Sequence, residues 1–371
     1  MRTVITNFDC VTAYGAGVRP LWDGLTRGVT ALSPPPAEFS HLTTGAVGLV
    51  PGEYLGEAPS RLMRLIMTLA ARRQIIPPED AAVMVASTVG EIDYLETALM
   101  TGTGRPEQSR LADLPDKIAA RFHMTRPGIL VSSACASSTV ALNRADALIR
   151  AGRESAVLIV GADAVSEFIL AGFASLMALD LDRARPFDHN RSGLSAGEAA
   201  VGVLLMSEER AEKEGRQPLA RILGGGMSCD ANHMTGPSRD GVGLARAVTA
   251  AIHHVDADSV GLIAAHGTGT LYNDAMEMKA LKRVFTCPRP AFSVKGGTGH
   301  TMGGAGLVQT IAAVEALFAR SAPPTVGLHQ VCEEADGWAG PAPRAVEGDR
   351  ALIVNAGFGG VNAATLLEVI R

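Results

Sequence analysis

The stretch Gly128-Ile-Leu-Val-Ser-Ser-Ala-Cys-Ala-Ser-Ser138 joins two kinds of secondary structure. Residues 128–133 form an apolar run of strand length, and residues 135–150 follow a helical pattern with small residues in the first turn. The sequence therefore predicts a buried strand that runs into a helix, with Cys135 at the junction. Because a helix N-terminus carries unpaired N–H groups and a partial positive charge, we expect a lowered pKa for Cys135 and a place for an oxyanion.

The same alternation of strands and helices continues on both sides of this stretch. Strands are expected at 3–8, 81–86, 128–133, 156–161, 199–206, 220–224, 260–265, 291–294, 351–355 and 361–369. Helices are expected at 60–73, 114–122, 136–150, 242–254, 275–284 and 306–319. Continuous apolar runs such as 156–161 are typical of strands that are buried on both faces. The pattern predicts an α/β fold with helices packed on sheets.

The chain also shows signs of two similar halves. Residues 208–218 are the most charged segment and indicate a connector. The strand-end segment 157–163 loosely matches 261–267, which favours an internal duplication. We therefore expect an N-terminal half at 1–210 and a C-terminal half at 218–371.

Charge and composition exclude some classes of function. The chain has 371 residues, with 33 Lys and Arg against 38 Asp and Glu, and no basic patch, so a nucleic-acid partner is not expected. Hydrophobic residues make up 47% of the chain but aromatic residues only 4%, which predicts a core of aliphatic side chains.

The cysteines indicate the compartment. There are five, widely spaced and without a CxxC pair, so neither a disulfide framework nor a metal site is expected. A reducing compartment follows. The first residues enter a strand with no leader, and no stretch is expected to be long and apolar enough to span a membrane, so we expect a soluble, cytoplasmic protein.

Two histidines lie on glycine-rich turns at strand ends. His266 stands in Ala265-His-Gly-Thr-Gly-Thr270, where Thr268 and Thr270 add hydroxyl groups. His300 stands in Lys295-Gly-Gly-Thr-Gly-His300, five residues after Lys295. Either histidine alone would more often be structural. Two of them in such turns are hard to explain by packing and indicate a site.

A third glycine-rich turn, Asn355-Ala-Gly-Phe-Gly-Gly-Val-Asn362, separates two apolar strands. By itself it is typical of a simple hairpin. Phe358 is flanked by glycines, however, and is poorly placed for a core residue and well placed to move.

One thiol and two imidazoles form an unusual set. A cysteine protease needs one histidine and a group that orients it. A second neutral imidazole directed at the same centre suits a carbonyl that becomes an enolate, as in a decarboxylative condensation.

At these residues the sequence resembles the elongating β-ketoacyl-[acyl-carrier-protein] synthases of type I and II, as a compact variant. The matching segments follow the family's order over about 230 residues: 133–138, 184–188, 197–198, 233–235, 266–270, 273–274 with 277, 295 with 299–301, and 357–360. Together they are very specific, although no single one would be.

The resemblance implies a thiolase-like fold, with two duplicated halves in a five-layer α/β/α/β/α arrangement, and a dimer. It implies condensation of an acyl group on Cys135 with malonyl-acyl carrier protein to give 3-oxoacyl-acyl carrier protein and CO2, in fatty acid or polyketide elongation. The substrates are carried on the phosphopantetheine of the carrier protein, and no cofactor or metal is expected. The dimer partner is either the same chain or a ketosynthase-like subunit.

The resemblance also assigns roles to individual residues. Cys135 is the nucleophile, and His266 and His300 act on the malonyl thioester. Lys295 supports His300, and Phe358 gates the nucleophile.

Other roles concern binding. The N–H groups of Cys135 and Phe358 form an oxyanion hole under this assignment. Thr268 and Thr270 bind the phosphopantetheine arm.

The sequence departs from the family at two positions. Gln309 stands where the family has a Glu paired with Lys295, so Glu198 or Glu277 is a candidate replacement. Ala356 stands where the family has Phe, which would open space for a bulkier or more rigid acyl group. We expect a specialised synthase, for example one that extends unsaturated or aryl polyene chains, paired with a catalytically silent homologue.

Three related classes of protein share parts of this pattern. A thiolase would need a second catalytic Cys in the turn that here carries Phe358. An initiating ketosynthase would have Asn in place of His300. The open alternative is a non-elongating, chain-length-factor-like partner subunit of a ketosynthase heterodimer, which would be expected to lack Cys135.

Overall fold

The computed structural model describes residues Met1–Arg371. Ten strands form one path in the order β4-β3-β5-β6-β1-β7-β13-β12-β8-β9, and β2 is attached to β1. Their bounds are β1 (Thr3–Thr12), β2 (Gly15–Ala16), β3 (Ala82–Ala86), β4 (Gly128–Val131), β5 (Ala156–Asp163), β6 (Ala199–Ser207), β7 (Ala220–Cys229), β8 (Leu262–Ala264), β9 (Ala291–Phe292), β12 (Arg350–Gly357) and β13 (Val361–Val369). β10 (Ser321–Ala322) and β11 (Arg344–Ala345) form a separate pair.

The helices lie between these strands in the chain. They are α1 (Val18–Thr26), α2 (Arg61–Ala71), α3 (Asp93–Thr101), α4 (Leu114–Arg121), α5 (Ser137–Arg150), α6 (Glu167–Ser175), α7 (Glu208–Lys213), α8 (Val242–Ala251), α9 (Leu271–Val284), α10 (Lys295–Thr298) and α11 (Ala305–Ala319). Every strand and helix expected from the sequence is present, with ends shifted by up to five residues.

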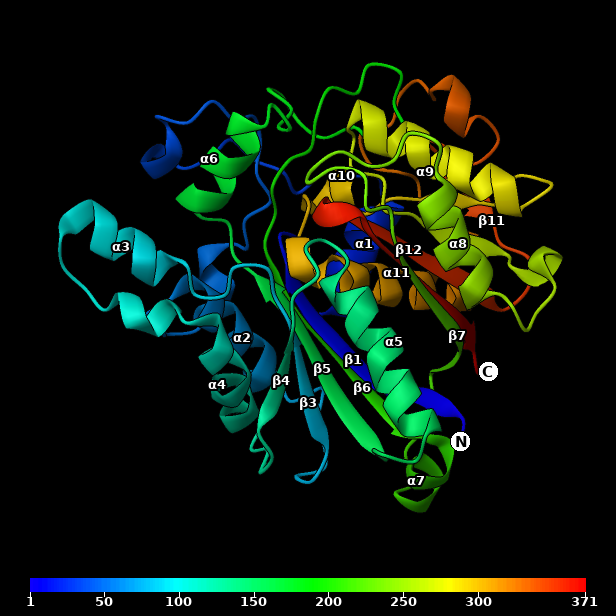
Figure 1. Ribbon diagram of the computed structural model, residues 1–371, viewed down its shortest axis with the longest axis horizontal. Helices are drawn as coiled ribbons and strands as arrows, with labels where there is room; N and C mark the ends of the chain where they lie inside the picture. Colours follow the sequence, from blue (N-terminus) through cyan, green and yellow to red (C-terminus); the bar gives the residue numbers. More distant parts are fainter.

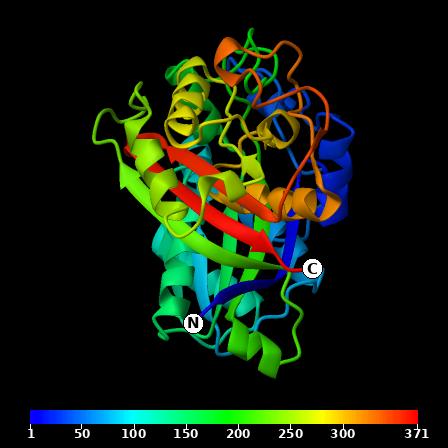
Figure 2. The same cartoon turned by 90° about the vertical axis from the view of Figure 1, so that its right-hand side faces the viewer.

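The strands fall into two groups that meet where β1 pairs with β7. Helices α5 and α11 contact each other and strands of both groups, so they form a central layer. Helices α2 and α4 cover the outer face of one group, and α8 and α9 lie on the outside of the other (Figure 1). Figure 2 shows the second group, with β7, β12 and β13, crossing the first. This five-layer α/β arrangement confirms the thiolase-like fold; the domain bounds at 1–210 and 218–371 stay a prediction.

Side-chain burial explains why β5 and α5 are central. All eight residues of β5 are buried, as expected for a continuous apolar run in a covered strand. Helix α5 buries small residues, including Ala141 and Ala145, which let it lie close to the strands on both sides.

The segment Met302–Ala319, which includes α11, corrects the expectation about membrane spans. It is long and apolar enough to cross a membrane. In the structure 83% of it is buried, because it is the central helix of the core. Such a helix is apolar all round for the same reason as a membrane helix, since no face meets water.

Candidate active site

Cys135 lies at the tip of a sharp turn between β4 and α5. The turn depends on Ala134, which has a left-handed φ of 48° that costs a non-glycine residue about 1–3 kcal/mol. The Ser137 hydroxyl stabilises it, because it accepts from the Ser133 N–H at 2.8 Å and donates to the Ala134 carbonyl at 2.6 Å. The strained backbone at Ala134 thus places the thiol at the start of the central helix.

The electrostatic expectation for Cys135 is wrong. Burial raises the pKa of the thiol to about 11, although the charge of Lys295 and the N–H groups of Phe358 and Cys135 oppose the rise. The helix start therefore does not by itself make a resting thiolate, because loss of hydration outweighs it. The N–H groups of Phe358 and Cys135 are both directed toward the sulfur.

This raised pKa predicts the pH dependence of thiol reactivity. Alkylation of Cys135 by iodoacetamide should accelerate about tenfold per pH unit from about pH 7 to 10, because only the thiolate reacts and its fraction grows tenfold per unit below the pKa. Peptide-level mass spectrometry would follow Cys135 separately from the exposed Cys229 and Cys287. A rate already constant above about pH 7 would show that the thiol is acidic after all.

His266 follows β8, and buried carboxylates of α9 hold its turn. Glu277 accepts the N–H groups of His266 at 2.6 Å and Gly267 at 2.8 Å. Asp274 accepts the N–H of Thr268 at 2.9 Å. Burial raises the pKa of Glu277 to about 7, while these N–H groups oppose the rise. Glu277 is therefore a supporting residue, through the backbone of the histidine turn.

His300 lies between α10 and α11, and residues of the N-terminal half of the chain accept hydrogen bonds from the backbone around it. Its N–H donates to the Ser195 carbonyl at 2.7 Å. The Asp163 carboxylate accepts the N–H of Gly303 at 2.7 Å, which fixes the residues just after it. Nδ1 of His300 accepts from the Met302 N–H at 3.1 Å, so the ring proton is on Nε2. That Nε2 is buried and has no partner in the protein.

The two imidazoles lie close together in an edge-to-face arrangement and are both neutral. Their ring centroids are 5.4 Å apart with an interplanar angle of 84°. Burial lowers the pKa of His266 and His300 well below the usual value, and the charge of Lys295 lowers both further. Nδ1 of His266 accepts from Asn355 at 3.0 Å, so its proton also lies on Nε2. The site therefore has two uncharged Nε2–H donors.

Lys295 contacts His266 directly, and its charge also acts on His300. Its ammonium donates to the His266 carbonyl and lies 3.3 Å from Nδ1 of the same residue and 3.4 Å from Oε1 of Gln309. Burial lowers the pKa of Lys295 to about 8, and the charge of Glu277 opposes the decrease.

No carboxylate lies within salt-bridge distance of Lys295. Glu198, one candidate replacement, forms a two-pronged ion pair with Arg61 at 2.7 and 2.6 Å instead. Glu277, the other candidate, acts on Lys295 through space and makes its hydrogen bonds to the backbone. The amide of Gln309, and not a carboxylate, is therefore the side-chain neighbour of the Lys295 ammonium on α11.

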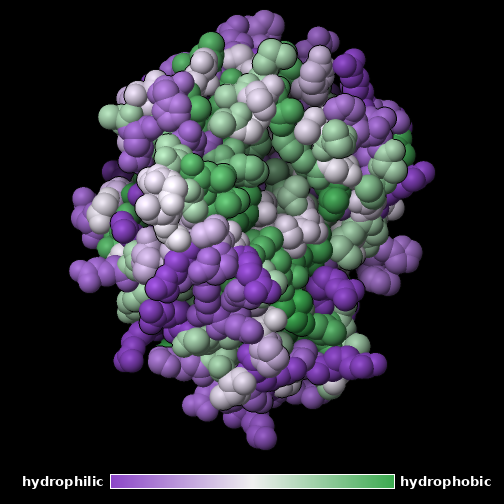
Figure 3. Space-filling view, turned by 60° about the vertical axis from the view of Figure 1, so that its left-hand side comes forward, coloured by the Kyte–Doolittle hydropathy of each residue, from purple (hydrophilic) through white to green (hydrophobic).

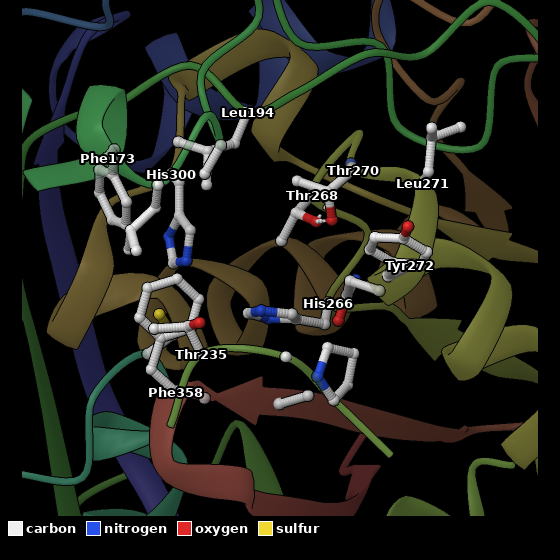
Figure 4. Close-up of a pocket in the computed structure, with 18 of the residues that line it drawn as sticks. Phe173, Leu194, Thr235, His266, Thr268, Thr270, Leu271, Tyr272, His300 and Phe358 are labelled. Atoms are coloured by element: carbon white, nitrogen blue, oxygen red, sulfur yellow. Dashed lines mark hydrogen bonds between the residues drawn. The ribbon is translucent and has the colours of Figure 1, made fainter. Parts of the chain in front are cut away.

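These side chains surround one cavity of about 390 Å3. Its lining includes all three candidate catalytic residues and Thr268, Thr270, Ala356 and Phe358. In Figure 4, Phe173 and Leu194 lie toward one end, Thr268, Thr270 and Tyr272 toward the other, and His266 between them. Phe358 packs edge-on against Phe173 with ring centroids 6.0 Å apart. The cavity thus has an apolar end and a hydroxyl-bearing end.

Sequence reasoning missed several residues of the site. Phe173 lies on α6, a helix that was not expected although Ser166 caps its first turn by accepting from the Ile169 N–H at 3.3 Å. Asp163 was visible only as the end of a buried strand. Asn355 was part of a quoted turn, and its position at the end of an apolar strand was the available signal.

Comparison with known proteins agrees with this geometry. The family models described as the N-terminal and C-terminal domains of β-ketoacyl synthase match residues 68–211 and 219–329. The chain belongs to the β-ketoacyl synthase family. A 3-oxoacyl-[acyl-carrier-protein] synthase 2 of Vibrio harveyi is 30% identical over 409 aligned positions, which cover 100% of this chain and 99% of the relative. This supports the enzyme class expected from the sequence. The alignment is longer than the 371 residues here, so this synthase is compact.

Two solved structures are also similar to this β-ketoacyl synthase over its whole length. The ishigamide ketosynthase/chain length factor is 28% identical with a TM-score of 0.89, covering 100% of this chain and 99% of that one. A chain of the complex between the ketosynthase ApeO and its chain length factor ApeC from Xenorhabdus doucetiae is 25% identical with a TM-score of 0.85, covering 100% of this chain and 98% of that one.

Proposed function

We propose that this chain is an elongating ketosynthase that condenses an acyl group on Cys135 with malonyl-acyl carrier protein. The observation that carries the proposal is one cavity lined by a thiol and two neutral imidazoles. The Nδ1 atoms of both imidazoles are engaged by the protein, which leaves their Nε2–H groups free to donate to a substrate in the cavity. A non-elongating, chain-length-factor-like subunit is the alternative, and it would have no use for the nucleophile at Cys135.

In the first step the Cys135 sulfur attacks the carbonyl of an acyl thioester. The oxyanion accepts from the N–H groups of Cys135 and Phe358. The carrier thiolate leaves and takes up the proton that the Cys135 thiol has lost. The acyl group then extends toward Phe173 and Leu194, at the apolar end of the cavity.

In the second step the malonyl thioester binds with its carbonyl oxygen toward His266 and His300. The bond to the carboxylate breaks, CO2 leaves, and the electron pair forms an enolate whose oxygen both Nε2–H groups hold. The enolate carbon attacks the acyl carbonyl on Cys135. The carbon–sulfur bond breaks, the thiolate takes up a proton, and 3-oxoacyl-carrier protein is released.

Thr268 and Thr270 would bind the phosphopantetheine arm that delivers both substrates. Their hydroxyls are 2.9 Å apart at the hydroxyl-bearing end of the cavity. Leu271 and Tyr272, which are mostly exposed, continue this end to the surface. Amide groups of the arm could exchange hydrogen bonds with the two hydroxyls.

Dimer formation is supported by the surface. β4 is an edge strand with an unpaired side, and Ile129 on it is 51% exposed. Apolar side chains also gather on one face of the molecule around a hollow (Figure 3). Because both of these solved structures are of a ketosynthase together with a chain length factor, we propose a ketosynthase-like partner, either a second copy or a related subunit.

The five cysteines are all unpaired in the structure. Free thiols persist in a reducing compartment. We therefore propose a soluble, cytoplasmic enzyme that works with a cytoplasmic carrier protein.

The lining of the cavity supports a specialised substrate. Ala356 lines the cavity beside Phe358, where a larger residue would fill space. Ala356→Phe should lower kcat/KM for long, rigid polyene or aryl donors by about tenfold or more, because a pocket discriminates by the volume that it can hold. Competition between such a donor and acetyl-carrier protein would measure the ratio. An unchanged ratio would place the acyl chain elsewhere.

The proposal is tested with malonyl-carrier protein and a panel of acyl-carrier proteins. Intact mass spectrometry of the carrier should show 3-oxoacyl products two carbons longer than the donor. Elongation that appears only when a second ketosynthase is added, and that survives loss of Cys135 here, would support the chain-length-factor alternative instead.

A further inference from the structure

Asn355 and Gln309 form a buried pair of neutral amides behind His266. Both are 0% exposed, and the Asn355 Nδ2 lies 2.7 Å from the Gln309 Oε1. We propose that Asn355 is a positioning residue for His266 and that Gln309 and Thr139 hold Asn355 in the orientation that this requires. The role rests on the proposed function, because His266 is the imidazole that would hold the malonyl thioester oxygen.

The orientation of Gln309 is fixed by three backbone oxygens. Its Nε2 lies 2.9 Å from the Ala264 carbonyl, 2.8 Å from the Ala265 carbonyl and 3.0 Å from the Val354 carbonyl. These oxygens only accept hydrogen bonds, so the nitrogen of the amide must face them. Oε1 of Gln309 is therefore the end that faces Asn355.

The orientation of Asn355 follows from both of its ends. Its Nδ2 faces Oε1 of Gln309, which only accepts. Its Oδ1 lies 2.5 Å from the Thr139 hydroxyl, which can donate. The second hydrogen on Nδ2 is then directed at Nδ1 of His266, 3.0 Å away. Nδ1 must accept this bond, so the imidazole proton is placed on Nε2, the atom that faces the cavity.

A carboxylate could not take the place of either amide. At Gln309 it would turn an oxygen toward three carbonyl oxygens, and at Asn355 it would remove the donor to Nδ1 of His266. Lys295 alone does not decide the ring orientation, because its ammonium is shared between the His266 carbonyl, Nδ1 and Gln309. The pair thus explains why an amide stands where a carboxylate was expected.

The test reads the protonated ring nitrogen directly. Nitrogen NMR of the full-length protein with labelled histidine, assigned with a His266→Gln variant, should show Nε2 protonated and Nδ1 unprotonated in the wild type. In Asn355→Asp the new carboxylate accepts from the ring, so Nδ1 should become protonated. Decarboxylation of malonyl-carrier protein should then decrease by about 100-fold, while acylation of Cys135 changes little.

Asn143→Asp is the matched control. Asn143 is also buried, but its amide donates to two backbone carbonyls, at 3.3 and 3.1 Å, and it does not contact a histidine. This variant should leave the His266 spectrum and decarboxylation unchanged. It thereby distinguishes the general effect of burying a carboxylate from the specific effect of a carboxylate beside His266.

Two results would overturn the role: a wild-type His266 protonated on Nδ1, or an Asn355→Asp ring that keeps Nδ1 unprotonated. The wild-type spectrum decides even where Asn355→Asp does not fold. The spectrum is recorded without substrate, so an enzyme without condensing activity would overturn the proposed function separately.

Discussion

Cys135→Ser should lose the acyl-enzyme adduct, with acylation at least about 1000-fold slower than in the wild type. A serine hydroxyl is much less acidic than a thiol, and the structure offers no base to the side chain at this position. Both imidazole Nδ1 atoms accept bonds from the protein, so the nitrogens that face the cavity carry protons. The N–H groups of Cys135 and Phe358 would still hold an oxyanion, but no adequate nucleophile would form one.

Intact mass spectrometry after incubation with acyl-carrier protein measures this loss. Cys229 and Cys287 are exposed and could acquire acyl groups without catalysis, so a Cys229→Ser, Cys287→Ser double variant provides the background. It should form one adduct at the wild-type rate. An adduct of the same yield in Cys135→Ser would show that another residue is the nucleophile.

His300→Ala should spare acylation and decrease decarboxylation of malonyl-carrier protein by about 100- to 1000-fold. The Nε2–H of His300 is buried and has no partner in the protein, so nothing else replaces its bond to the enolate oxygen. Cys135 and its two N–H donors belong to other turns of the chain and should be unaffected. We therefore expect the histidine to be needed only after the acyl group has been loaded.

The two half-reactions can be measured separately in this variant. Mass spectrometry gives the adduct, and release of labelled CO2 gives decarboxylation. His253→Ala, on the exposed surface away from the cavity, is the matched control and should match the wild type in both. Loss of acylation with normal decarboxylation would reverse the assigned role of His300.

The sequence predicted the fold because its strands and helices are locally consistent. Continuous apolar runs such as β5 and the abrupt strand-to-helix change at Cys135 specify buried strands and the central helix. Helix α6 was missed because it is short and apolar on most sides, so no periodic pattern marked it. Met302–Ala319 was not interpreted as a possible span, although only its place in the core distinguishes it from one.

The candidate site was predictable where a single turn carries the signal. Cys135, His266 and Phe358 each follow a strand, whereas His300 follows the short helix α10, and all four stand beside small residues. Their environment was not predictable, because it depends on residues far apart in the chain.

The raised pKa of Cys135 results from burial by several elements, which no local pattern shows. Likewise, Gln309 contacts residues 45 positions away on both sides, so its role was visible from the sequence only as a missing carboxylate.

A two-stage mass measurement tests the central claim most directly. Acyl-carrier protein is added to the enzyme first, and malonyl-carrier protein second, with enzyme and carrier weighed at both stages. The account predicts an adduct on Cys135 in the first stage. In the second stage that adduct should disappear as 3-oxoacyl-carrier protein, two carbons longer, appears with CO2. An adduct that malonyl-carrier protein cannot discharge, or no adduct with any donor, would contradict it.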